Sequence, residues 1–268
     1  MEQGFGTIRY QRADDIGTLT LARPGKRNAQ NPLMWQELAA LGEKLLAEDD
    51  LRCLVVRGEG KDFSAGIDLV EGMAGLLADL AAAPESRLAE GLALAQTFRW
   101  IRQLGCASVA AVQGHAYGAG LQLALACDFR ILADDAKVGL LETRYGLLPD
   151  MGATVWLPRL IGDGRAREMI LLGEIIDAAE AQRIGLTNQV VPADNLEGAV
   201  FDMAGRIAAQ PPLAVRGARR AMDAAWHNDE SQGFRAAVTE QLVCVTSEDF
   251  AEGGRALAEG RTPRWQGR

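Results

Sequence analysis

The first two thirds of the chain repeat one pattern: a short apolar run, a polar or glycine-bearing loop, and then a longer segment with helical spacing. Five runs with the composition of strands predict β structure, and the first two are joined by a turn at Asp14-Asp15. The predicted strands are residues 7–12, 17–21, 53–57, 109–112 and 129–133. Helices are expected at residues 32–49, with Asn31 as N-cap and Pro32 as first residue, and at 86–104 and 121–126. Strands separated by crossover helices indicate an α/β fold with a parallel sheet.

The pattern changes at about residue 153, after which glycines and prolines separate mostly helical segments. The predicted helices are residues 165–172, 178–183, 195–209, 212–227 and 231–244, with a last one from about 247. We therefore predict an α/β core of residues 1–195 and a helical region of residues 196–268 that packs on the core or on a neighbouring chain. The alanine-rich segment 78–84 is expected to shape one end of a binding pocket.

Charge and length limit the function classes. The chain has 268 residues, with 36 acidic and 28 basic side chains and a formal net charge of −8. A chain of this length buries a sizeable core without disulfides or metals. A general nucleic-acid surface is not expected, because phosphate binding needs a basic face. A local basic pocket for a phosphorylated ligand is still compatible with this charge.

The cysteines and histidines favour an intracellular protein without a metal site. The four cysteines form no CxxC pair and are expected to be reduced core thiols. They are Cys53, Cys106, Cys127 and Cys244. With two histidines in the chain, a zinc site is not expected. The beginning of the sequence has no basic segment followed by an apolar one, and the apolar stretch 109–127 is interrupted by polar residues, so we expect a cytoplasmic protein and no membrane span.

Two loops have the composition of an oxyanion site. Residues 63–69 and 114–120 each follow a predicted strand and place small residues where a helix is expected to begin. Small residues let a ligand approach the backbone, and free N–H groups at a helix start favour negative charge. Two such turns side by side would direct one N–H each at the oxygen of a thioester enolate, and each donor is typically worth about 3 kcal/mol. Taken singly, each loop is equally compatible with a turn that only packs a helix on the sheet.

Motifs along nearly the whole chain together resemble those of the enoyl-CoA hydratase/isomerase (crotonase) family. The matching stretches are LARP (21–24) with Asn28-Ala29, FSAGID (63–68), AAVQGHAYGAG (110–120), ACDFR (126–130), GLLPD (146–150), LPRLIG (157–162), EA (180–181), GL (185–186), VV (190–191) and SEDFAEG (247–253). The resemblance implies a spiral of ββα units with a C-terminal helical region for oligomerisation, homotrimers or homohexamers, and coenzyme A thioester substrates. It implies no separate cofactor, since coenzyme A is part of the substrate.

The resemblance also implies roles for individual positions. The oxyanion N–H groups would belong to Ile67 and Ala119, where an alanine replaces the family's usual glycine but keeps the backbone N–H. The coenzyme A site would be lined by Arg27, Ala29, Ala65, Gly66, Asp68 and Gly118. The basic cluster of Arg216, Arg219 and Arg220 is either a solvated helix face or a contact for coenzyme A phosphates.

The expected acid–base groups depart from the family's hydratases, which use two glutamates. One falls at Glu142, but the other position is Gln122, which cannot exchange a proton and could only orient a water. Asp150 matches an aspartate that several isomerases of the family use, although it could equally cap the next helix. Glu142 could be a buried acid–base group or a surface carboxylate paired with Arg144. His115 is expected to make local contacts.

These residues predict an enoyl-CoA hydratase or isomerase in fatty-acid or related acyl-CoA metabolism. Glu142 is compatible with hydration, while Gln122 and Asp150 favour a shift of the double bond. Two alternatives stay open: an acyl-CoA-binding protein with lost catalysis, which Gln122 would favour, and another reaction of the family such as decarboxylation or thioester hydrolysis.

Overall fold

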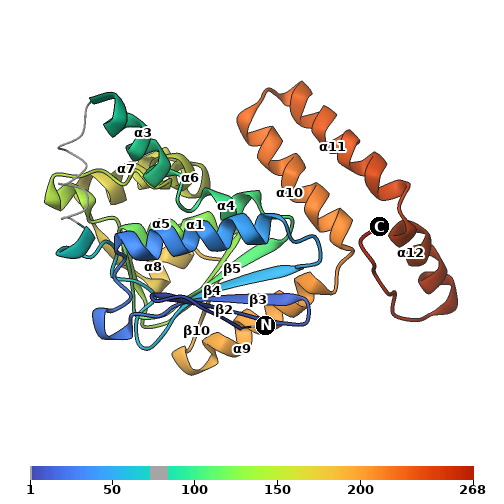
Figure 1. Ribbon diagram of the computed structural model, residues 1–268. Helices are drawn as coiled ribbons and strands as arrows, with labels where there is room; N and C mark the ends of the chain where they lie inside the picture. The colour runs from blue at the N-terminus through green and yellow to red at the C-terminus, as the bar shows by residue number, and fades with distance from the viewer. Residues whose placement is uncertain (1, 73–83) are drawn as a thin grey trace.

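The computed structural model describes residues 2–72 and 84–268, and its centre is a seven-stranded sheet (Figure 1). The strand order is β1-β2-β3-β4-β5-β7-β10. The strands are β1 (Glu2–Gly4), β2 (Ile8–Ala13), β3 (Ile16–Leu21), β4 (Cys53–Gly58), β5 (Ala107–Val112), β7 (Phe129–Ala133) and β10 (Gln189–Val191). β1, β2 and β3 pair antiparallel, and every pair from β3 to β10 is parallel. The predicted α/β class with a parallel sheet is confirmed.

A second, three-stranded sheet adjoins the loops of interest. It consists of β6 (His115–Tyr117), β8 (Lys137–Gly139) and β9 (Ile175–Asp177). β6 lies inside the segment predicted as a loop, so that part of the prediction was wrong. Three-residue strands carry too little periodicity to be recognised in a sequence, because their pairing partners supply the order.

Helices cover both faces of the main sheet, and the C-terminal helices extend beyond it (Figure 1). They are α1 (Pro32–Leu46), α3 (Pro84–Ala95), α4 (Arg99–Gln103), α5 (Ala119–Ala126), α6 (Ala153–Ile161), α7 (Asp163–Leu172), α8 (Ala178–Arg183), α9 (Leu196–Ala208), α10 (Pro212–His227), α11 (Glu230–Val245) and α12 (Glu248–Glu259). Asn31 caps α1 as expected, because its side chain accepts a hydrogen bond from the N–H of Met34. Within residues 2–72 and 84–268, no helix combines the length and apolar character needed to cross a bilayer.

The single helix predicted at residues 86–104 is instead two helices, α3 and α4. The chain turns between them so that Phe98 and Ile101 are fully buried, whereas Leu88 and Leu92 on α3 stay exposed. Most of the segment 78–84 lies outside the described residues.

Alternation along the strands divides the core into two layers. Val55, Val109 and Ile131 face α9, whose Leu196 and Val200 complete that layer. The intervening residues of the same strands face the other layer, which contains α1 and α5 (Figure 1). Helix α9 therefore packs on the sheet, although it lies within the predicted C-terminal region.

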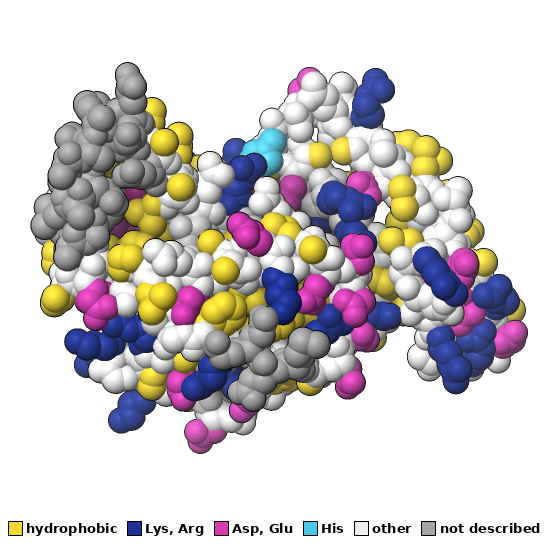
Figure 2. Space-filling model, in the orientation of Figure 1, with side chains coloured by type: hydrophobic (Ala, Val, Ile, Leu, Met, Phe, Trp, Pro, Cys, Tyr) yellow, Lys and Arg dark blue, Asp and Glu magenta, His cyan; other side chains and the backbone are white. Residues whose placement is uncertain are grey.

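Helices α10 and α11 form an antiparallel pair that extends away from the sheet, followed by α12 (Figure 1). Side chains on α11 at helical spacing are exposed and apolar: Phe234, Val238 and Leu242. Figure 2 shows hydrophobic side chains gathered on this projecting part. The division at residue 195 and the oligomerisation role of residues 196–268 stay predictions.

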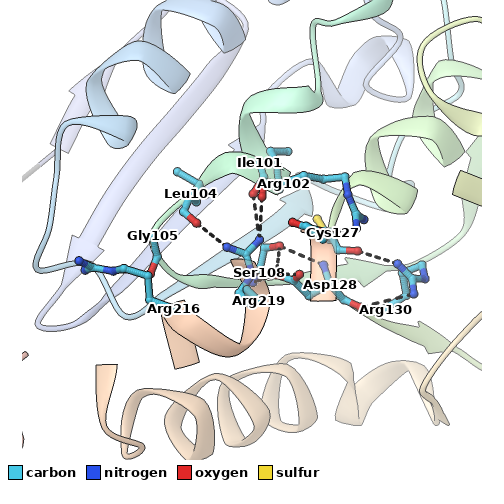
Figure 3. A network of polar contacts seen from close by, with 11 residues as sticks. Ile101, Arg102, Leu104, Gly105, Ser108, Cys127, Asp128, Arg130, Arg216 and Arg219 are labelled. Carbon is cyan, nitrogen blue, oxygen red and sulfur yellow. Dashed lines mark hydrogen bonds and ion pairs between the residues drawn. The ribbon is translucent and has the colours of Figure 1, made fainter. Parts of the chain in front are cut away.

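Arg219 fixes α10 to the body of the protein (Figure 3). Arg219 is 7% exposed, and its guanidinium forms an ion pair with Asp128 at 3.1 Å and donates to the carbonyls of Leu104 and Ile101. Asp128 in turn accepts two hydrogen bonds of 2.8 Å from Ser108. Both expectations for Arg219, a solvated face or a phosphate contact, were therefore wrong, because a buried guanidinium needs this many acceptors to offset its desolvation.

The cysteines are reduced, and three of them are buried. Cys53, Cys106 and Cys127 lie within the core layers, and Cys106, in the segment between α4 and β5, also lines a small cavity together with Pro212 and Val215 of α10. Burial raises the pKa of the Cys106 thiol to about 12, so it is protonated and unreactive at neutral pH.

Candidate active site

The two predicted oxyanion loops lie side by side. Isolated bridges join Ser64 to Ala116 and Gln30 to Ile67. The N–H of Ser64 donates to His115 at 2.9 Å, and the carbonyl of Ser64 accepts from the N–H of Tyr117 at 3.0 Å. This backbone pairing fixes the distance between the loop that follows β4 and the loop that opens α5.

The N–H groups at this junction that have no acceptor in the described part of the chain include those of Ile67 and Ala119. Ala119 is the first residue of α5, where an intrahelical acceptor is not available. Gly66 brings the loops together, because a Cβ at its position would lie 2.6 Å from the carbonyl oxygen of Tyr117 and 3.6 Å from the nitrogen of Ala119. Only a residue without a side chain allows this approach, and the φ of +91° at Gly66 also favours glycine.

A mostly apolar cavity of about 830 Å³ opens at these loops. Its described lining is Trp35, Ala65, Gly66, Ile67, Leu69, Leu94, Tyr117, Gly118, Ala119, Gln122, Leu141, Glu142, Tyr145, Gly146, Leu147, Leu148, Asp150 and Met151. Glu142 and Asp150 are the charged members of this set. Sequence analysis missed the apolar wall: Trp35 and Leu94 come from helices α1 and α3, and nothing in their spacing distinguishes a cavity wall from core.

Glu142 presents one free carboxylate oxygen to this region. Its Oε1 accepts a hydrogen bond of 2.8 Å from Nε2 of Gln122, and its Oε2 is buried without a partner in the described chain. Desolvation raises the pKa of Glu142, and the charge of Asp150 adds to the rise, while the bond from Gln122 opposes it. The described residues contain no ion pair between Glu142 and Arg144, so the surface-pair interpretation was wrong.

Asp150 lines the same cavity, with its side chain open to solvent on one side. Burial of the remainder raises the pKa of this carboxyl. Helix α6 has Gly152 as its N-cap and no side-chain cap bond to that residue, so Asp150 does not act as the expected cap. Two carboxyls with raised pKa values thus border one cavity, an arrangement suited to proton transfer.

The positions predicted to line a coenzyme A site divide into two groups. Ala65, Gly66 and Gly118 border the cavity. Arg27 adjoins them, because its carbonyl accepts from the N–H of Ala65, and its side chain is 67% exposed. Ala29 lies outside the cavity lining, on the same loop as Arg27.

Asp68 is directed into the protein rather than toward the cavity. It is buried, forms an ion pair with Arg23 at 3.1 Å, and accepts the N–H groups of Val70 and Glu71. The hydrogen bond from the N–H of Glu71 is the main cause of its lowered pKa. These contacts leave Asp68 a structural part of the loop.

His115 makes local contacts, as expected. Its Nδ1 lies 2.5 Å from Oδ1 of Asp62, and its ring packs 5.0 Å from the ring of Tyr117. Among the described residues, no three His, Cys, Asp or Glu side chains converge as metal ligands would.

Known proteins of one family are similar to this chain over nearly its whole length. The family model for enoyl-CoA hydratase/isomerase matches residues 11–268. A Mycobacterium bovis protein named "Probable enoyl-CoA hydratase" is 34% identical over 261 residues, covering 97% of this chain and 98% of that protein. The crystal structure of an enoyl-CoA hydratase from Bacillus anthracis superposes with a TM-score of 0.89 at 33% identity, covering 98% of this chain and 100% of that one. A Thermobifida fusca structure in complex with acetoacetyl-CoA has a TM-score of 0.81 at 35% identity, covering 90% and 95%. With the crotonase fold shared over almost its full length, the chain belongs to the enoyl-CoA hydratase/isomerase family.

Proposed function

We propose that this chain is an enoyl-CoA isomerase, which moves a double bond along an acyl-CoA thioester through an enolate. One observation carries the proposal. A desolvated glutamate with a free oxygen, Glu142, and the unpartnered N–H groups of Ile67 and Ala119 belong to one apolar cavity. The relative from Thermobifida fusca, whose structure contains acetoacetyl-CoA, supports an acyl-CoA thioester as the ligand.

The two N–H groups would bind the thioester oxygen. Removing a proton from the carbon next to the carbonyl places negative charge on that oxygen, and donors already in position stabilise it without reorganisation. Each donor is expected to contribute about 3 kcal/mol to the transition state. The apolar surroundings strengthen this interaction, because few water dipoles compete.

The two carboxyls would move the proton. Oε2 of Glu142 takes a proton from C2 of a 3-enoyl thioester, and the electron pair of that C–H bond moves into the conjugated enolate. A proton then adds at C4 as the electron pair of the enolate oxygen returns, which leaves the 2-enoyl thioester. Asp150, with its raised pKa, would donate that second proton. Substrate and product are isomers, so no further reactant is consumed, and transfer of a proton from Glu142 back to Asp150 through solvent restores both carboxyls for the next turnover.

Hydration of 2-enoyl thioesters is the second candidate, because the Mycobacterium bovis relative is named as a hydratase. Two observations favour isomerisation over it. Gln122 cannot exchange a proton, and both of its amide atoms are engaged by Glu142 and by the N–H of Ala153. Asp150 lines the cavity and caps no helix.

We further infer that coenzyme A passes Ala65 and Gly66 and that Arg27 meets its phosphates, because Arg27 is bonded through its carbonyl to Ala65 of the cavity lining and its side chain is 67% exposed, with its Nε 3.9 Å from Asp62. We also infer a cytoplasmic homotrimer or homohexamer, in which the exposed apolar face of α11 is buried. Light scattering of the full chain would test the assembly, and a monomer at micromolar concentration would contradict it.

Mass spectrometry in heavy water tests the reaction. The purified protein is incubated with 2-enoyl- and 3-enoyl-CoA thioesters, and the products are weighed and fragmented. Deuterium incorporation with a shifted double bond would support isomerisation, and a product heavier by one heavy-water molecule would support hydration instead. Thioesters that bind but emerge unchanged would refute both and favour an acyl-CoA-binding protein.

Asp150→Asn separates the roles of the carboxyls. The variant should lose the double-bond shift, while Asp163→Asn, an exposed aspartate at the start of α7 away from the cavity, should keep it. Full activity of Asp150→Asn would remove Asp150 from the mechanism.

A further inference from the structure

Gln122 connects two parts of the site that are distant in sequence. It is 2% exposed on α5, and its Nε2 donates to Oε1 of Glu142 at 2.8 Å. Its Oε1 accepts the N–H of Ala153 at 3.2 Å. Ala153 is the first residue of α6, and the N-cap of that helix offers no side-chain acceptor, so a residue of another helix supplies the cap.

The direction of these two bonds is fixed by chemistry. The N–H of Ala153 requires an acceptor, so the amide oxygen of Gln122 must face α6. The amide nitrogen must then face Glu142, where it donates to an ionised carboxylate. A glutamate at position 122 could satisfy Ala153 but would have no proton for Glu142 unless the two carboxyls shared one.

We propose that Gln122 is a positioning residue that ties Glu142 to the start of α6. It holds one oxygen of the Glu142 carboxylate, leaves the other as the single reacting oxygen, and fixes the distance from Glu142 to the segment that carries Asp150. Position 122 therefore tunes the proton affinity of Glu142 rather than orienting a water.

The surroundings of Glu142 make this tuning measurable. Burial raises its pKa, the charge of Asp150 raises it further, and the bond from Gln122 lowers it by stabilising the ionised form. Asp150 is the titratable group of the described chain whose charge reaches Glu142. Arg144, in the same single turn of 3₁₀ helix (Glu142–Tyr145) as Glu142, forms no ion pair with it within the described residues. Removing the bond from Gln122 must therefore raise the pKa of Glu142.

This inference rests on the proposed role of Glu142 as proton carrier, so the test needs a readout that is independent of turnover. Carboxyl carbon NMR of the full chain with labelled glutamate follows the titration of Glu142, whose signal is assigned by its loss in Glu142→Gln. Gln122→Met keeps the side-chain volume but removes both bonds, and Gln122→Glu is nearly isosteric if the methionine variant fails to fold. Gln122→Met should titrate at higher pH than the parent, and in Gln122→Glu the upper step of the coupled pair of carboxyls should lie above the parent midpoint. Gln113→Met, which removes a half-buried amide that donates to the carbonyl of Gly58 at the end of β4, should leave the midpoint unchanged.

Kinetics supply the second readout. For the thioester that the parent protein isomerises, Gln122→Met should lower kcat on the order of 10- to 100-fold, as for a lost hydrogen bond to a charged group, with the acid limb of the pH profile displaced upward. KM should change little. In Gln122→Glu the two carboxyls should titrate as a coupled pair with two apparent steps.

Three outcomes are distinguishable. A displaced NMR midpoint and a displaced acid limb support the positioning role. An unchanged midpoint, or a lower kcat with an unchanged pH profile, overturns it. If the parent protein turns over no enoyl thioester, the proposed function fails, while the NMR midpoint still decides whether Gln122 controls Glu142.

Discussion

Replacing Gly66 by alanine should separate the two oxyanion loops. The new Cβ would lie 2.6 Å from the carbonyl oxygen of Tyr117, which is backbone and cannot rotate away. A non-glycine residue at φ +91° costs about 1–3 kcal/mol, and overpacking costs a further 1–3 kcal/mol or so. We therefore expect a loss of about 2–6 kcal/mol in the free energy of unfolding.

The displacement should also reduce catalysis. The N–H of Ile67 follows Gly66 directly, so moving Gly66 away from Tyr117 moves that donor away from the N–H of Ala119. Loss of one such donor typically lowers kcat by about 10²–10³-fold. Gly185→Ala is the matched control, because Gly185 has a φ of +80° with open space around its Cα, so it carries the backbone strain without the clash.

Urea unfolding and steady-state kinetics of both variants provide the measurement. Gly66→Ala should be less stable than Gly185→Ala by about 1–3 kcal/mol, and it alone should lose activity. If the two variants are equally stable and Gly66→Ala keeps the parent kcat, the close approach of the loops does not form the site.

Three further perturbations test other parts of the structure. Glu142→Gln should lower kcat by about 10²–10⁴-fold, measured with the same thioester. Burial raises the pKa of Glu142 in the folded protein above its ordinary value of 4.5, so ionisation of this carboxyl is less favourable in the folded state. It therefore destabilises the fold as pH rises above 4.5. The same variant should therefore be more stable than the parent at neutral pH and lose this advantage below pH 4.5, as followed by thermal unfolding across pH. Arg219→Met should lower the free energy of unfolding in urea by about 3–5 kcal/mol, because it leaves the Asp128 carboxylate without its ion-pair partner. Arg220→Met, which breaks an exposed ion pair with Glu240, should lower it by about 1 kcal/mol or less. A thioester whose acyl chain ends in a carboxylate should have a kcat/KM roughly 10-fold or more below that of its methyl-ended analogue. The reason is that the described cavity lining has no cation to pair with the carboxylate, and residues 73–83 contain neither Lys nor Arg. Equal values of kcat/KM for the two thioesters would contradict this.

Local sequence patterns predicted those parts of the fold that are determined by residues close together in the sequence. The long strands, the cap at Asn31 and the start of α5 follow from apolar runs and turn residues within a few positions. The two loops predicted to form an oxyanion site were recognised from glycines and small residues after a strand, and the structure places them side by side, although each loop alone is equally compatible with a turn that packs a helix on the sheet. The strands β6, β8 and β9 were missed, because three residues gain their structure only from partners elsewhere in the chain.

The contacts between side chains of the site were harder to predict than its loops. Gln122 lies 20 residues from Glu142 and 31 residues from Ala153, and no local pattern reports that all three meet. Arg219 lies 91 residues from Asp128, so the sequence shows a basic helix face where the structure has a buried ion pair. Asp150 looks like a cap beside Pro149, and only the coordinates of the helix start show that it is not one.

The placement of Cys106 gives the protein an internal reporter of its own opening. This residue lines a small cavity together with Pro212 and Val215 of α10, whereas Cys53 lies inside a strand of the sheet. If the helical arm formed by α10, α11 and α12 detaches while the sheet stays intact, Cys106 becomes reactive and Cys53 does not. The order in which these two thiols react with a labelling reagent therefore distinguishes release of the arm from global unfolding.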